Sequence, residues 1–287
     1  MTDRAPMRVG VGLPAAVPRA GPDQILGWAR RAEAAGFSSL AALDRVVYAN
    51  HEPLLTLAAA AAVTERIALA THVLLGATRE PALLAKQAAT LHSLSGGRFT
   101  LGLGVGVRPA DYAATGTPFA DRGRRLDGVV DALRHTWASA GTAGAIGPVS
   151  PGGRPGLVLG GRSPRALDRA ARLGDGWVAG STAFFAEGAA VVREAWRRHG
   201  REGAPRLLAV GYVALGADGP TQARRYLPEY YGVAAEAATT LASTALTSPR
   251  AVRDTVRRLA GEGCDELVLY PCGADPDQVG LLAEALR

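Results

Sequence analysis

Short apolar runs alternate with amphipathic segments along this chain, and the two patterns predict strands and helices in turn. Continuous apolar runs are typical of strands buried on both faces, as in parallel sheets. They predict strands at residues 8–13, 38–43, 67–73, 98–103, 157–160, 176–179, 207–214 and 267–270. Apolar positions at helical spacing, many of them after an initial proline, predict helices at residues 22–35, 53–64, 81–93, 121–137, 164–173, 184–199, 249–261 and 276–286.

Eight strand–helix units in one chain predict a closed (β/α)8 barrel of the TIM type in preference to an open doubly wound sheet. Residues 138–156 are rich in glycine, proline, alanine and serine and are expected to form a loop. Residues 218–248 are expected to form a longer, irregular region. Because barrels of this length occur as one domain, residues 1–287 are predicted to be a single domain.

Composition narrows the expected location and partners. No apolar run is long enough to cross a membrane, and the first residues lack the apolar core of a secretory signal. Cys264 and Cys272 fit neither a zinc site nor a disulfide framework. These features predict a cytoplasmic protein with no metal site and no membrane partner.

The chain is basic, with a formal net charge of +6 and a sequence pI of about 9.8. Its arginines are scattered through the predicted helices and form no stripe, and aromatic residues for base stacking are few. We therefore expect no nucleic-acid partner. The charge instead favours attraction of a small molecule, including an anionic one.

Glycines recur at every second position of the fourth predicted strand and its end, at Gly102, Gly104 and Gly106. Alternate residues of a strand lie on one face, so this face carries no side chain. Such a face either receives a planar ligand or fits into a tightly filled barrel interior. The spacing alone leaves both interpretations open.

Barrel active sites are built at the C-terminal ends of the strands, and the turn Gly160-Gly161-Arg162-Ser163-Pro164 follows the fifth one. Its glycines allow a close approach to the backbone, and a helix begins directly after them. Free N–H groups at a helix N-terminus favour a phosphate, to which Arg162 and Ser163 could donate. Ser163 as an ordinary N-cap is the alternative, and both interpretations can hold together.

Two further polar residues end predicted strands. Asp44 follows an apolar strand, where a carboxylate is either functional or paired with Arg45 or another local arginine. His72 ends the third strand and is either a catalytic group or a satisfied structural residue.

Several segments together resemble the luciferase-like family of flavin- and deazaflavin-dependent oxidoreductases. The resemblance covers nearly the whole chain, and it is the combination of segments that is specific. The segments are RVGVGLP (8–14), AGF (35–37), RIALATHVLL (66–75), REPALLAKQAATL (79–91), SGGRF (95–99), LGLGVG (101–106), GGRSP (160–164) and AARLGDGW (170–177).

The resemblance implies a usually dimeric barrel that binds reduced FMN or coenzyme F420, an 8-hydroxy-5-deazaflavin, at the strand ends. The phosphate would bind at Gly160, Gly161, Arg162 and Ser163. The basic balance of the chain favours F420, whose polyglutamate tail is anionic. The small organic substrate would be reduced or monooxygenated.

The ring of the cofactor would lie against the strand end at Gly104, Gly106 and Val107. Family members often carry a non-proline cis peptide that buttresses the ring, and here it would fall at His72–Val73. Asp44 and His72 would be the polar groups nearest the ring and are therefore the catalytic candidates. Arg45 or Arg108 would hold an anionic substrate or the cofactor tail.

This chain also departs from the family pattern. Arg45 replaces a histidine that many members carry, and Val107 replaces the glutamate of the sugar-phosphate dehydrogenases. The segment 138–156 is shorter than in typical members. A non-catalytic flavin-binding or storage barrel is therefore the alternative. An aldolase or isomerase barrel is disfavoured because the only lysine, Lys86, lies in a predicted helix.

Overall fold

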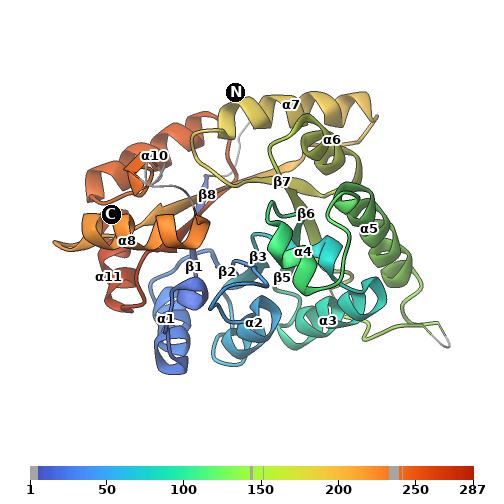
Figure 1. Ribbon diagram of the computed structural model, residues 1–287, viewed down its shortest axis with the longest axis horizontal. Helices are drawn as coiled ribbons and strands as arrows, with labels where there is room; N and C mark the ends of the chain where they lie inside the picture. Colours follow the sequence, from blue (N-terminus) through green and yellow to red (C-terminus); the bar gives the residue numbers. More distant parts are fainter. Residues whose placement is uncertain (1–5, 143–144, 151, 233–238, 241) are drawn as a thin grey trace.

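A ring of parallel strands surrounded by helices forms the centre of the molecule (Figure 1). The computed structural model describes residues 6–142, 145–150, 152–232, 239–240 and 242–287. The strands are β1 Arg8–Gly12, β2 Ser39–Ala42, β3 Ala68–Thr71, β4 Leu74–Leu75, β5 Phe99–Gly104, β6 Gly156–Gly160, β7 Gly176–Ala179, β8 Arg206–Val213 and β9 Glu266–Pro271.

The sheet has the order β3-β2-β1-β9-β8-β7-β6-β5-β4, and a further pairing of β3 with β5 closes it. Strand β3 pairs with the start of β5, and β4 pairs with its end. These two short strands therefore occupy one position of the barrel, interrupted at His72 and Val73. The predicted (β/α)8 barrel is confirmed, with all strand pairs parallel.

Helices cover the outside of the barrel, and several begin with a proline in the first turn, as the sequence predicts. They are α1 Pro22–Ala34, α2 Pro53–Ala61, α3 Pro81–Leu94, α4 Pro109–Ala114, α5 Arg122–Ala138, α6 Pro164–Leu173, α7 Phe185–Arg198, α8 Gly219–Tyr231, α10 Pro249–Gly261 and α11 Asp277–Ala285.

Alternate residues of each strand belong to two separate apolar cores. On β8, Leu207 and Ala209 face the outer helices, whereas Leu208, Val210 and Tyr212 face the barrel interior. Side chains of α8 join the inner cluster, because this helix packs over the mouth of the barrel. Among the described residues, no helix has the length and apolar character needed to cross a membrane.

Helices α4 and α8 are absent from the sequence prediction, which gave an irregular region at residues 218–248. Two prolines lie in α8, Pro220 in the first turn and Pro228 inside the helix. From the sequence alone, each proline predicts an interruption of a helix. The helix ends at Gly232 in the left-handed conformation, with φ of 57°. Burial of its tyrosines in the inner core outweighs the local penalty of these prolines.

Candidate active site

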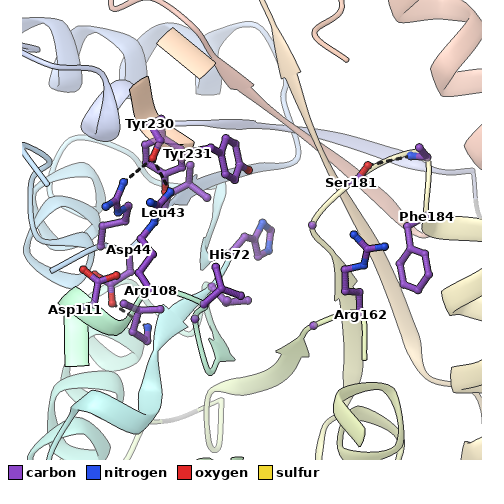
Figure 2. A pocket seen from close by; sticks show the side chains of 18 residues that line it. Leu43, Asp44, His72, Arg108, Asp111, Arg162, Ser181, Phe184, Tyr230 and Tyr231 are labelled. Carbon is purple, nitrogen blue, oxygen red and sulfur yellow. Dashed lines mark hydrogen bonds between the residues drawn. The ribbon is translucent and has the colours of Figure 1, made fainter. Parts of the chain in front are cut away.

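A cavity of about 600 Å³ opens at the C-terminal ends of the strands, where barrel active sites are built (Figure 2). Its walls come from residues that are far apart in the sequence. The lining residues are Leu43, Asp44, Arg45, His72, Val73, Leu75, Gly106, Val107, Arg108, Asp111, Gly161, Arg162, Gly180, Ser181, Ala183, Phe184, Tyr230 and Tyr231.

The floor of the cavity is the interruption between β3 and β4, where the His72–Val73 peptide bond is cis, as predicted. The Val73 side chain enters a space left by two glycines of neighbouring strands. A Cβ built on Gly104 would lie 2.4 Å from Val73 Cγ2, and one on Gly160 would lie 2.9 Å from Val73 Cγ1. These glycines therefore accommodate the bulge, and neither lines the cavity.

The same explanation holds for Gly102, where a Cβ would lie 1.9 Å from the main-chain oxygen of Thr71. Of the two interpretations of the glycine face, close packing applies to Gly102 and Gly104. The face is not bare, because the adjacent strand fills it. Only Gly106, with φ of 68°, reaches the cavity, and it too contacts a neighbour at Leu75.

Asp44 is buried at the end of β2 and forms an ion pair with Arg79 at 3.0 Å. The same carboxylate oxygen accepts a hydrogen bond from the N–H of Leu75, at 2.9 Å. Burial raises the pKa of Asp44, although Arg79 and this N–H act in the opposite direction. Asp44 is therefore a paired carboxylate, but its partner is Arg79, 35 residues away, and not Arg45 or another arginine close in sequence. Asp44 anchors the strand that follows the bulge.

His72 lies in the centre of the cavity in Figure 2 and is only 5% exposed. Neither of its ring nitrogens has a hydrogen-bond partner among the described residues. Burial lowers the pKa of His72 to about 4, against a smaller opposing effect of Glu266. The imidazole is therefore neutral at pH 7 and offers one donor and one acceptor.

Arg45 and Arg108 line the cavity, yet both donate to the main-chain oxygen of Tyr230 near the C-terminus of α8. The Arg108 bond measures 2.8 Å, and Arg45 donates a second one to Val47 O at 3.1 Å. Carbonyl groups at a helix C-terminus carry partial negative charge and favour cations. The structure brings these residues together as a clamp on α8.

Tyrosines form the roof of the cavity and extend into the barrel. Six of the seven tyrosines of the chain take part in a connected set of ring contacts. The hydroxyl groups of Tyr212 and Tyr231 lie 2.8 Å apart. This cluster is not among the features predicted from the sequence, where its one signal is the pair Tyr230-Tyr231 one helical turn after Tyr226. The members are Tyr48, Tyr212, Tyr226, Tyr230, Tyr231 and Tyr270.

The opposite wall is the turn into α6, which Figure 2 shows on the far side of His72 from the tyrosines. Gly161 has φ of 138°, and Ser163 caps the helix by accepting from Ala166 N at 3.3 Å. Arg162 lies 5.4 Å from the centre of the Phe184 ring. Within the described part of the chain, Arg162 forms no ion pair and no hydrogen bond, so its charge is available. Ser163, like Gly160, does not line the cavity itself.

Comparison with known proteins decides the family. A family model described as luciferase-like monooxygenase matches residues 5–287. The chain belongs to the luciferase-like monooxygenase family. The resemblance inferred from the sequence is therefore confirmed.

Among curated relatives of this luciferase-like chain is an uncharacterised protein of Mycobacterium tuberculosis, 33% identical over 53% of this chain and 63% of the relative. An F420-dependent glucose-6-phosphate dehydrogenase of Kribbella flavida is 30% identical over 61% of this chain and 58% of that enzyme. The chain thus matches about three-fifths of the length of these relatives.

The fold of the luciferase-like chain is also found in solved structures. An F420-dependent secondary alcohol dehydrogenase, bound to an F420-acetone adduct, has a TM-score of 0.80 at 16% identity. The match covers 99% of this chain and 100% of that one. At this level of identity the likeness bears on the fold alone.

The mouth of this luciferase-like site holds an apolar residue, Val107, at the position where the sequence resemblance implied a glutamate for sugar-phosphate dehydrogenases. Val107 lines the cavity and is 81% exposed. The nearby carboxylate of Asp111 already accepts from Val46 N at 3.0 Å and Val47 N at 2.7 Å. Both carboxylates of the cavity, Asp44 and Asp111, are therefore engaged in holding main-chain segments.

Proposed function

We propose that the protein is an oxidoreductase that uses reduced coenzyme F420 or FMN to transform a small organic substrate in this cavity. The observation that carries the proposal is the exposed turn Gly161-Arg162 at the N-terminus of α6, beside the buried and unpartnered His72. An available cation at the N-terminus of a helix, where the helix dipole favours negative charge, suits a phosphate. Membership of the luciferase-like family supports the same class of reaction.

The residues present fit such a cofactor. A Cβ at Gly161 would lie 2.5 Å from Ala166 Cβ, so the turn stays close to the helix only with glycine here. Arg162 and the α6 N-terminus would hold the phosphate, and His72 and Val73 would face the ring. The cofactor would supply the hydride or activate oxygen. Neutral His72 would offer a hydrogen bond without placing a charge beside the ring.

Of the two cofactors, we propose F420, because the basic balance of the chain suits its anionic tail. The Kribbella relative and the secondary alcohol dehydrogenase, both F420-dependent by name, support this choice. The test is titration of the purified protein with each oxidised cofactor, followed by absorbance and fluorescence. Micromolar binding of FMN without binding of F420 would overturn it.

A second candidate is a flavin-binding barrel without catalytic activity. The exposed Val107 and the engaged carboxylates favour it, because the cavity has no free carboxylate for acid–base work among the described residues. Tight binding of a reduced cofactor without turnover of aldehyde, ketone or alcohol substrates would support this candidate. Oxygen uptake measured with product analysis would separate monooxygenation from simple reduction.

A further inference from the structure

The hydroxyl pair Tyr212–Tyr231 connects the barrel interior to the cavity. Tyr212 projects inward from β8 and is 5% exposed, whereas Tyr231 ends α8 and lines the cavity. Their oxygens lie 2.8 Å apart, and either atom could be the donor. The direction of this hydrogen bond decides which hydroxyl proton is left for another partner.

The hydroxyl protons available to Tyr212 and Tyr231 favour Tyr212 as the donor of this hydrogen bond. Each phenol has one proton and can also accept. If Tyr231 donated to Tyr212, the Tyr212 proton would be buried with no acceptor among the described residues, and an unmade buried donor is costly. If Tyr212 donates, its proton is satisfied, and the proton of Tyr231, a half-buried residue that lines the cavity, is left for a partner there. A hydroxyl that accepts a hydrogen bond also becomes a better donor.

The surroundings of Tyr231 suit an oxygen that gains negative charge. Burial raises the pKa of Tyr231, while the hydrogen bond from Tyr212 and the charge of Arg108 lower it. The phenol is therefore protonated at neutral pH and lies within the field of a guanidinium. The remaining contacts nearby are aromatic, with Tyr230 and Tyr231 rings at 5.1 Å.

We propose that Tyr231 donates a hydrogen bond to the carbonyl-type oxygen of an aromatic or apolar substrate, and that Tyr212 holds it in this role. The inference rests on the proposed function, because it assigns a substrate contact in the same cavity. In a reduction, a bound reduced flavin or deazaflavin would supply a hydride, with its two electrons, to the carbonyl carbon. The oxygen gains the Tyr231 proton, and water at the cavity mouth returns a proton to the phenolate. Tyr231 thus replaces the acid–base group that Arg45 and Val107 cannot supply.

The test compares acetophenone with α-methylstyrene, which has the same shape but a CH2 group in place of the oxygen. Both are titrated calorimetrically into the protein alone and into the protein saturated with oxidised F420 or FMN. The wild type should bind acetophenone about two- to tenfold more tightly than the hydrocarbon, as one hydrogen bond predicts. Equal affinities in the wild type would overturn the proposal without any variant.

Tyr231→Phe removes only the hydroxyl and should bring the two affinities together. Tyr226→Phe, a buried phenol of the same helix outside the cavity, should keep the preference and serves as the control. A preference retained in Tyr231→Phe would also overturn the proposal. Cofactor titrations distinguish failure of the proposed function from failure of the Tyr231 contact. If F420 and FMN both fail to bind while the preference for the ketone persists, the proposed function fails and the Tyr231 contact stands. If a cofactor binds and the preference is absent, the Tyr231 contact alone fails.

Discussion

The two walls of the cavity both carry arginines, but the arginines are engaged differently. On the α8 wall, Arg45 and Arg108 donate to the Tyr230 carbonyl and hold the helix in place. On the α6 wall, Arg162 has no polar partner within the described residues and touches only the Phe184 ring. The difference shows that an arginine beside a cavity is a candidate for binding a ligand only if its guanidinium is not already engaged by the protein. In the proposed function, Arg162 of the α6 wall would bind the phosphate of the cofactor, whereas Arg45 and Arg108 hold α8 through the Tyr230 carbonyl.

The largest expected effect comes from the floor that the two walls share. Gly102→Ala would place a Cβ 1.9 Å from Thr71 O, a main-chain atom that cannot turn aside. We expect the free energy of unfolding to fall by about 3 kcal/mol or more, because the bulge must shift. Chemical denaturation measures this. Gly128→Ala in α5, where a Cβ meets nothing within 4 Å, is the control and should be neutral or slightly stabilising.

The second effect concerns His72, which lies between the walls. Its pKa is about 4 in the folded protein and near 6.5 when unfolded, so between these values only the unfolded chain binds the proton. Stability should therefore fall as the pH drops from about 6.5 to about 4, by up to about 3 kcal/mol. His72→Gln should remove this part of the slope. Identical pH profiles for the two proteins would show that burial does not hold His72 neutral.

The third prediction separates the two walls directly. Arg162→Ala should weaken binding of the phosphate-bearing cofactor about tenfold, because a charge-assisted contact at a largely exposed site is lost. The melting temperature should hardly change, since the only contact described for Arg162 is with the Phe184 ring, at 5.4 Å from its centre. Arg165→Ala, an exposed arginine of the same helix outside the cavity, is the matched control. Equal cofactor affinities of Arg162→Ala and the wild type would show that Arg162 does not bind the phosphate of the cofactor.

The sequence predicts the barrel and the start of α6 well, because both depend on local signals. Apolar runs locate each barrel strand, and the GGRSP turn identifies a helix start close to the cavity. The α8 wall and the ion pair of Asp44 cannot be predicted in this way, because their contacts join distant segments. Arg45 is 185 residues from Tyr230 and Asp44 is 35 residues from Arg79, and no local pattern reveals either pair. The cis peptide was expected only through family resemblance.

The smallest effect tests the clamp on α8. Arg108→Ala removes the 2.8 Å hydrogen bond to Tyr230 O and should lower the free energy of unfolding by about 1 kcal/mol. Cofactor affinity should stay unchanged, the reverse of the outcome for Arg162→Ala. Arg225→Ala, exposed on the same helix, is the control and should leave stability within about 0.5 kcal/mol.

The competing view is that Arg45 and Arg108 bind an anionic substrate, as the sequence alone suggested. Inorganic phosphate or sulfate would then raise the melting temperature of the wild type and lose this effect in Arg108→Ala. If the arginines serve the helix, the anions should stabilise wild type and variant equally. Burial and the adjacent charge of Arg45 both lower the pKa of Arg108. The Arg108 guanidinium therefore lies next to a like charge, and its hydrogen-bond acceptor is the Tyr230 carbonyl. An anion that bound between the two guanidinium groups would compete with the Tyr230 carbonyl, and binding would therefore loosen α8.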